Sequence, residues 1–583
     1  MSSHVTPSEE LIRQHLIDER ARLEQEAGLD PRQMQHFERP AERPFTRDQR
    51  PHTTVLYGGL TWKHEHLIQG ALAGLGYLCE PLPVPDVAAF QLGKEYGNNG
   101  QCNPTYFTVG NLVKHLQTLE RGGVSRQDIL GKYIFVTAGA CGPCRFGMYE
   151  SEYRLALRNS GFDGFRVILF QQAGGLDQSG AETGLEMNTD FFLGLLNAMN
   201  MGDLLNDVGY QVRPFEVEPG SIDRALDAGM ERLYEVLRDK RRFSLEGAIG
   251  RLISDRKLGD IAGKARTFAD QLVTDEYTGA FRAVGEELAA VRLDRTRVKP
   301  IVKITGEFWA QTTEGDGNFK MFSFLEGENA QVVVEPVGTW IMYLIHQAKQ
   351  MNMDRRHTTE DESMPASWRI DRRMANEVRA RRKNAVLTLA EAVFKREWRR
   401  LRAELNDIPH DLTDQYELQR LGHPYYNSRS GGGEGHLEVA KNSYYSNKDM
   451  AHMVLSLKPF GCMPSTQSDA VQSAVINQYK DMIYLPVETS GEGEVNAHSR
   501  VQMALGEARA KAREEIDRVQ AQVGITLEQA REFAVEHPQL ESAMYKVPHM
   551  KGCVGTAANF LHHVADLHQA ESRARIAVPS EVS

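Results

Sequence analysis

A C-G-P-C motif is the strongest chemical signal in this chain of 583 residues, which contains six cysteines. Cys141 and Cys144 lie in AGACGPCRFG, directly after the apolar run KYIFVTAG and before a helical pattern. Both sulfurs are therefore expected at the carboxyl edge of a sheet, where open α/β folds bind ligands. The amides of a helix N-terminus and the nearby Arg145 favour thiolate over thiol. This position predicts either metal ligands or a redox dithiol.

Three further cysteines stand next to glycines before helical segments. Cys102 lies in YGNNGQCNPTYF, Cys462 in LKPFGCMPS and Cys553 in HMKGCVGTAANF. Gly and Asn let the backbone turn sharply and approach a bound group closely. Cys79, inside the apolar run YLCEP, is instead expected to be a small buried hydrophobe. Cysteines at several separate turns favour one shared site.

Both zinc and an iron–sulfur cluster accept four thiolates, so the spacing of the cysteines has to discriminate between them. Structural zinc sites usually combine two local C-x-x-C pairs, whereas this chain combines one pair with cysteines far away in the sequence. Dispersed ligands favour an iron–sulfur cluster placed between α/β lobes. Two alternatives stay open: a thiol–disulfide oxidoreductase that uses Cys141 and Cys144, and a non-catalytic scaffold with a structural metal site.

Composition restricts the class of protein. Hydrophobic residues make up 41%, charged residues 25% and the formal net charge is -11, which is ordinary for a soluble protein and disfavours binding to duplex nucleic acid. The first residues lack the pattern of an export signal, and no apolar run is long enough to cross a bilayer. Sparse cysteines do not indicate a disulfide scaffold. We therefore expect a cytoplasmic protein that binds neither membrane nor nucleic acid.

The hydrophobic pattern predicts an α/β fold with large helical insertions, because short β-branched runs alternate with helical segments. Helical crossovers make the sheets parallel. The N-terminal arm is expected to be an appendage or an oligomer contact, which is compatible with a homodimer. The expected organisation is an N-terminal helix and arm, a first α/β domain with Cys102, Cys141 and Cys144, a helical region, a second α/β unit, a helical insertion and loop, a third α/β unit with Cys462, and a C-terminal helical segment, at 1–50, 51–180, 181–298, 299–345, 346–445, 446–525 and 526–583.

Other motifs carry weaker signals. The basic stretch 365–407 lacks the interleaved aromatic residues of a nucleic-acid surface, so we interpret it as a solvated or domain-bridging helix. SRSGGGEGH at 428–436 lacks the Lys and Ser/Thr of a phosphate loop, so we expect a flexible loop. Glu307, Glu488 and His498 are expected near strand tips, where they could act as acid/base groups.

The cysteine-bearing segments resemble a known family. GNNGQCNPTYFTVGNLVKHL, TAGACGPCRFGMYESEYRLALRNSGF and SLKPFGCMPS are similar to the 2-hydroxyacyl-CoA dehydratase family, especially its branch of acyl-CoA dehydratase activase-related proteins. The resemblance covers residues 50 to 175 and 300 to 500. It implies several Rossmann-like units around a cysteine-bound [4Fe-4S] cluster or a double-cubane cluster. It also implies that the stored electron drives a difficult reduction or a radical dehydration of an acyl-CoA.

Transferred by position, the resemblance makes Cys102, Cys141 and Cys462 the leading cluster ligands, with Cys144 next and Cys553 as a further candidate. It implies reduction by a separate ATP-dependent activator of the actin-like ATPase type, because this chain has no actin-like phosphate motif of its own. The chain is longer than a typical dehydratase subunit, and no segment reads as a CoA pocket. The substrate, an acyl-CoA or another small molecule, stays open.

Overall fold

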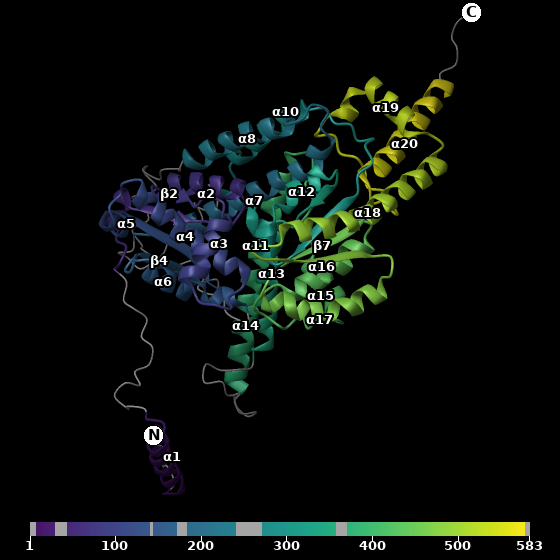
Figure 1. The fold of residues 1–583 in the computed structure, drawn as a ribbon. Coiled ribbons are helices and arrows are strands. Elements are labelled where there is room, and N and C mark those ends of the chain that lie inside the picture. The colour runs from purple at the N-terminus through teal and green to yellow at the C-terminus, as the bar shows by residue number, and fades with distance from the viewer. Residues whose placement is uncertain are drawn as a thin grey trace, which may run out of the picture. The chain divides into compact units, whose positions relative to one another are not determined.

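The computed structural model describes residues 7–28, 43–139, 144–171, 184–240, 271–356 and 370–577. The chain forms two compact units, Met1–Pro44 and Phe45–Ser583. The first contains helix α1 (Pro7–Glu26), in which Arg20 and Glu24 form an ion pair of 2.7 Å one turn apart. Its Leu11 and Leu16 side chains are exposed. All the strands belong to the second unit (Figure 1).

The first sheet has four parallel strands in the order β2-β1-β3-β4. The strands are β1 (Thr54–Tyr57), β2 (Leu78–Pro81), β3 (Tyr133–Gly139) and β4 (Arg166–Gln171). Every connection within this sheet contains a helix, as parallel pairing requires. The helices around it are α2 (Trp62–Gly74), α3 (Val87–Tyr96), α4 (Asn103–Arg121), α5 (Arg126–Lys132) and α6 (Tyr149–Asn159).

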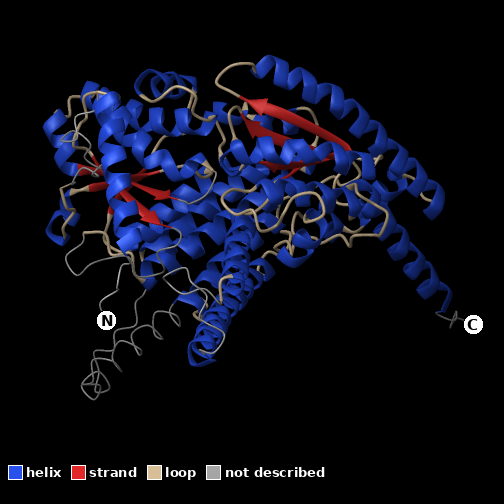
Figure 2. Cartoon of the chain, turned by 90° about the horizontal axis from the view of Figure 1, so that it is seen from below, coloured by secondary structure: helices blue, strands red, loops and turns tan. Residues whose placement is uncertain are grey.

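The second sheet is also four-stranded and parallel, in the order β6-β5-β7-β8. Its strands are β5 (Ile301–Gly306), β6 (Gln331–Val333), β7 (Met453–Pro459) and β8 (Ile483–Thr489). Every residue of β5 and β7 is buried, because both strands lie inside the sheet and helices cover its faces. The two sheets are the separate sets of red arrows in Figure 2.

This pairing joins segments that the sequence pattern separates. The segments expected as a second and a third α/β unit, 299–345 and 446–525, both supply strands to the second sheet, because β5 pairs directly with β7. The helical insertion 346–445 thus lies within one α/β domain rather than between two. Its helices are α13 (Val337–Asp354), α14 (Ile370–Ala403), α15 (Gln415–Gly422) and α16 (Gly435–Asn447), of which α13 begins before the expected boundary.

The other helices cover the sheets or link them. They are α7 (Thr189–Val212), α8 (Ser221–Arg238), α10 (Glu276–Ala289), α11 (Phe308–Thr312), α12 (Met321–Gly327), α17 (Met463–Gln478), α18 (Glu494–Val523), α19 (Leu527–Glu536) and α20 (Thr556–Ala577). Helix α7 is buried along most of its length and packs against both α2 and β6. It therefore forms a shared core element between the two sheets.

The expected α/β class is confirmed by the two parallel sheets and their surrounding helices. Within the described part of the chain, no helix combines the length and the apolar character that crossing a membrane requires.

Candidate functional site

Cys102 stands at the N-cap of α4, directly after the Gly/Asn-rich turn. Its side chain is buried, and its Sγ shares hydrogen bonds with the hydroxyls of Thr105 at 3.1 Å and Tyr149 at 3.3 Å. Pro104 lies in the first helical turn, where its missing N–H removes no helical hydrogen bond. The sequence of the turn thus fixes where α4 begins and holds the Cys102 thiol at the helix N-terminus.

Cys462 occupies the matching position in the second sheet. It is the N-cap of α17, which follows β7, and it is also buried. Gly461 adopts a left-handed φ of 76°, which a residue with a Cβ adopts only with strain. A Cβ at Gly461 would lie 3.4 Å from the Cα of Cys102. This glycine therefore lets the turn that carries Cys462 approach the turn that carries Cys102.

The two turns are also joined by a main-chain hydrogen bond. The amide of Asn103 donates to the carbonyl of Phe460 at 3.0 Å. Because α4 packs on the first sheet and α17 follows a strand of the second, this bond links the carboxyl edges of both sheets. The structure thus brings Cys102 and Cys462 together, as the sequence pattern predicts for a shared site.

Cys144 reaches the same place from a third direction. It precedes a short 3₁₀ helix, Arg145–Met148, and its Cβ lies 3.5 Å from the position that a Cβ on Gly433 would occupy. Gly433 itself has a left-handed φ of 112°. The Gly-rich segment that we interpreted from sequence as a flexible loop is therefore packed against Cys144. Cys141 lies outside the described residues.

Three glutamates lie around these thiols, of which Glu434 and Glu438 are buried and Glu307 is half-buried, and only Glu307 was singled out from the sequence. Glu307 caps α11, where its Oε2 accepts from the amide of Ala310 at 3.0 Å. Glu434 accepts from the amide of Phe308 at 2.7 Å. Glu438, on α16, accepts from the Ser465 hydroxyl at 2.7 Å. We call these residues and the three cysteines the thiol–carboxylate cluster: Cys102, Cys144, Cys462, Glu307, Glu434 and Glu438.

The glutamates of the cluster bind protons more tightly than free glutamates. Burial, followed by the neighbouring Glu434, raises the pKa of Glu307 to about 8. Burial likewise raises the pKa of Glu434 to about 7, with Glu438 adding to the effect. The pKa of Glu438 is also raised, chiefly by burial. Charged carboxylates this deep in the protein are unfavourable unless a cation compensates them.

The same surroundings raise the pKa values of two of the cysteines. Burial and then Glu434 raise the pKa of the Cys144 thiol to about 12. The pKa of Cys462 also rises well above its usual value, through burial first and then Glu307 and Glu438. Thiols with such pKa values are poor nucleophiles near neutral pH. A metal ion reverses this situation, because a coordinated thiol is deprotonated outright.

A buried amide next to Cys102 also lacks a partner. Asn103 is almost fully buried, and neither its Oδ1 nor its Nδ2 forms a hydrogen bond among the described residues. Buried polar groups in folded proteins normally have partners. Soft thiol donors, glutamates whose pKa values stay raised although Lys441 and Lys458 are near, and this amide together fit a bound metal centre with thiolate ligands.

The remaining candidates lie elsewhere. Cys553 is buried in the core formed by α18, α19 and α20, and Cys79 lies in β2, where its Sγ donates to the Gln69 carbonyl at 3.5 Å. Glu488 is exposed on β8. His498 stacks on Phe324 with ring centroids 3.8 Å apart and bonds to the Phe319 carbonyl. The structure brings none of these four side chains into the thiol–carboxylate cluster.

Sequence reasoning missed Glu434 and Glu438, although EGHLE follows the Gly-rich segment directly. The one available signal was two acidic residues four positions apart, at the start of a helix that follows left-handed glycines. That spacing places both on one helix face.

The cysteines do not reach a finished metal geometry among the described residues, in which no group of three or more His, Cys, Asp or Glu side chains is placed to hold a metal ion. Cys141 is outside these residues. Comparison of the whole chain with protein-family models and with curated proteins gave no match.

Proposed function

We propose that this chain is an iron–sulfur protein of the 2-hydroxyacyl-CoA dehydratase type, which passes a low-potential electron to a reductive or radical dehydration. The observation that carries the proposal is the meeting of Cys102 and Cys462 at helix N-termini on two different sheets, joined by the bond from Asn103 to Phe460. Two thiols 360 positions apart that meet at the edges of two sheets are well placed to share one bound group.

The cluster ligands would be Cys102, Cys462 and Cys144, together with Cys141, which precedes Cys144 by three positions. Cys553 is left out of this set, because it packs in the C-terminal helical core. A [4Fe-4S] cluster supplies one electron at low potential, and a double-cubane cluster supplies two. Glu307, Glu434 and Glu438 have raised pKa values, so near neutral pH they would act on a cluster mainly as neutral carboxyl groups that can donate hydrogen bonds.

The strand order of the first sheet supports a Rossmann-like arrangement of this unit. In the order β2-β1-β3-β4 the chain moves outward from β1 in both directions, so β1 and β3 flank the point where the order reverses. Ligands of doubly wound sheets bind outside the carboxyl ends of the strands at such a point. Cys144 follows β3, and Cys102 caps α4, the second helix after β2.

The thiol–disulfide alternative receives less support from the surroundings of Cys144. Exchange requires an attacking thiolate, and efficient exchange has a thiol pKa near the ambient pH. The pKa of Cys144 is raised to about 12 by burial and by Glu434. A cluster ligand tolerates these surroundings, because the iron itself stabilises the thiolate.

The proposal implies partners that the chain does not contain. Reduction would come from a separate ATP-dependent activator of the actin-like ATPase type, and the electron would pass to an acyl-CoA or a related small molecule. We place the protein in the cytoplasm, where thiols stay reduced until a cluster is inserted.

Anaerobic purification of the full chain tests the proposal, with iron, sulfide and zinc measured beside the EPR spectrum of the dithionite-reduced protein. We expect iron and sulfide in equal amounts and a reducible signal. Cys102→Ala and Cys462→Ala should each lose most of the iron, whereas Cys79→Ala and Cys553→Ala should retain it. Stoichiometric zinc, or a metal-free chain that takes up no iron on reconstitution, would contradict the proposal.

A further inference from the structure

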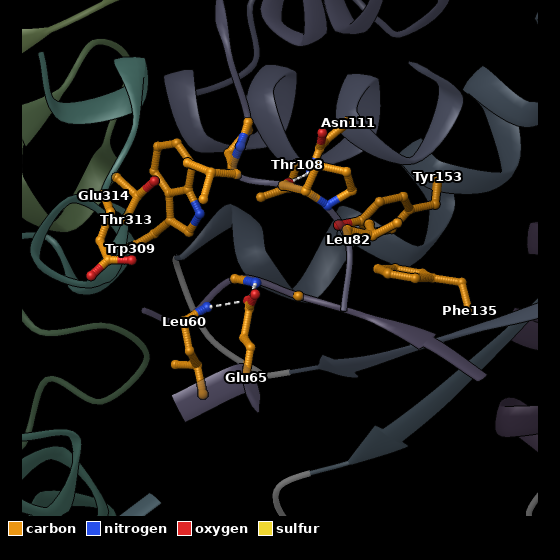
Figure 3. Close-up of a pocket in the computed structure, with 15 residues that line it drawn as sticks. Leu60, Glu65, Leu82, Thr108, Asn111, Phe135, Tyr153, Trp309, Thr313 and Glu314 are labelled. Carbon is orange, nitrogen blue, oxygen red and sulfur yellow. Dashed lines mark hydrogen bonds between the residues drawn. The ribbon is translucent and has the colours of Figure 1, made fainter. Parts of the chain in front are cut away.

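A cavity lies beside α4, and no described cysteine lines it. It is bounded by the loop after β1, by the loop after β2, by α4 and by the segment that follows α11. Figure 3 shows Phe135 and Tyr153 on one side of this cavity and Trp309 and Glu314 on the other. No lysine or arginine is among the described residues that line it. We call it the Glu65 pocket.

The two walls of the Glu65 pocket are fixed to each other. The amide of Trp62 donates to Glu314 at 2.8 Å, and the Thr312 hydroxyl donates to the Gly59 carbonyl at 3.2 Å. On the other side, the amide of Val87 donates to Asp316 at 3.0 Å. The pocket is therefore a built feature of the interface between the two α/β parts of the second unit.

Glu65 brings a buried carboxylate into this pocket. Its Oε1 accepts from the amides of Gly59 at 2.8 Å and Leu60 at 3.0 Å, as Figure 3 shows for Leu60. Only 7% of Glu65 is exposed. Burial raises the pKa of Glu65 to about 8 in spite of these two hydrogen bonds, and the nearby Glu314 contributes to the rise. No described Lys or Arg forms an ion pair with Glu65 to offset this burial.

A hydroxyl without a partner lies in the same pocket. Thr313 is 3% exposed, and its Oγ1 forms no hydrogen bond among the described residues. A buried hydroxyl of this kind is unfavourable unless a bound group satisfies it. The aromatic side chains of Trp309, Tyr153 and Phe135 also line the pocket, and the faces of such rings attract cations.

We infer that the Glu65 pocket binds a small ligand that carries a primary ammonium group. An ammonium has three N–H donors, and the pocket offers three acceptors in Glu65, the second carboxylate Glu314 and the unpartnered hydroxyl of Thr313, beside aromatic side chains that suit a short alkyl part. A ligand with neutral hydroxyls would satisfy the same acceptors but could not compensate the charge that Glu65 gains when it loses its proton. A carboxylate ligand would be repelled by both glutamates.

The competing interpretation is that Glu65 only braces the loop after β1 through its two amide contacts. Glu65→Gln separates the two interpretations, because a glutamine oxygen still accepts from Gly59 and Leu60 while the charge is lost. Thr313→Val removes the orphan hydroxyl and keeps the shape of the side chain. Glu532→Gln, at an exposed position of α19, is the matched control for loss of one carboxylate.

Calorimetric titration of the full chain tests this inference with n-propylammonium, n-propanol and propionate at equal ionic strength. We expect saturable binding of n-propylammonium and none of n-propanol or propionate. Glu65→Gln should weaken n-propylammonium binding about tenfold or more and Thr313→Val by a few-fold, in keeping with the loss of a charged and of a neutral hydrogen bond. Glu532→Gln should bind as the unmodified chain does.

Each opposite result overturns the inference. Equal binding of n-propanol would show that charge plays no part, and unchanged binding by a folded Glu65→Gln variant would leave Glu65 as a loop brace. Absence of saturable n-propylammonium binding to the unmodified chain would have the same consequence. If Glu65→Gln does not fold, unchanged binding by Thr313→Val decides against the inference. All these measurements are independent of whether iron is bound.

Discussion

Helix α16 contributes side chains to two groups of ionisable residues, the thiol–carboxylate cluster and a network around Glu335, and these groups are balanced very differently. Glu335, at the end of β6, accepts from Lys303 at 2.9 Å, from the Tyr445 hydroxyl at 3.0 Å and from the Thr413 hydroxyl at 2.7 Å. The pKa of Glu335 is lowered below its usual range, because Lys303 and Lys441 outweigh the effect of burial. In the thiol–carboxylate cluster, the pKa values of Glu307 and Glu434 move upward instead.

The difference separates structural from functional burial of charge. The Glu335 network is neutralised by the chain itself, so it ties β5, β6 and α16 together and needs no ligand. In the thiol–carboxylate cluster and the Glu65 pocket, burial outweighs the effect of any nearby cation, so these acids hold their protons near neutral pH unless a bound cation displaces them. A buried ionisable group whose pKa is raised by uncompensated burial is thus a better indicator of a site than burial alone.

The largest expected effect comes from breaking the balanced network. Lys303→Met leaves Glu335 buried beside Lys441 alone, and loss of one partner of a buried pair typically destabilises by about 3–5 kcal/mol. Urea denaturation of the metal-free chain measures this loss. Adding Glu335→Gln to Lys303→Met should restore part of the stability. A single variant as stable as the unmodified chain would show that the network is not the structural tie described above.

A smaller effect is expected from keeping the two sheet edges apart. Gly461→Ala meets a left-handed φ of 76° and places a Cβ 3.4 Å from the Cα of Cys102. The backbone strain costs about 1–2 kcal/mol, and the displaced turn should lower the iron content per chain. Gly524→Ala is the control, because Gly524 has a φ of 74° and no atom within 4 Å of an added Cβ. Equal iron content in both variants would show that the close approach of the two turns does not affect iron binding.

The smallest effect concerns the pH dependence of stability. The pKa of Glu65 is raised to about 8 in the folded chain, against about 4.3 in an unfolded one. The folded state therefore binds this proton more tightly, so its contribution to stability is complete below pH of about 4 and is lost as pH rises through 8. Glu314 and Tyr57 are the ionisable groups close enough to Glu65 to act on it.

Glu65→Gln should remove the contribution of Glu65 to the pH dependence of stability. The free energy of unfolding of the variant, relative to the unmodified chain, should increase between pH 6 and pH 8.5, when both are measured by urea denaturation without added amines. The exposed control Glu532→Gln should follow the unmodified chain at both pH values. A difference between Glu65→Gln and the unmodified chain that does not change with pH would mean that Glu65 is already ionised in the folded protein.

Local patterns in the sequence predicted the elements better than their assembly. The run HMVLSLKPFG predicted a buried strand that leads into the Cys462 turn, and β7 and α17 have this arrangement. The pairing of β5 with β7 was not predictable in this way, because a long helical insertion separates them and parallel strands carry no local signal for their neighbour.

The same distinction between local and long-range information applies to the candidate site. Residue type and turn composition were enough to predict the thiols as site candidates. Glu434 and Thr313 could be recognised only from the structure, because contacts between distant segments bury them. Glu65 sits in WKHEHL, where an acidic residue in the first turn of a helix is an ordinary feature. Its significance follows from burial against α11 and the loop after β2, which no local pattern encodes.

The bond from Asn103 to Phe460 also sets an order of events during biosynthesis. The Cys102 turn belongs to the part of the chain that forms the first sheet. The Cys462 turn opposite it follows β7, and β7 is in place only when it pairs with β5 and β8. A ribosome has therefore synthesised most of the polypeptide before both halves of the thiol–carboxylate cluster exist. Contacts of such long sequence separation are slow to form, because a long loop must be closed first. Insertion of any metal centre is thus a post-translational step, and a chain truncated before β8 would be made without it.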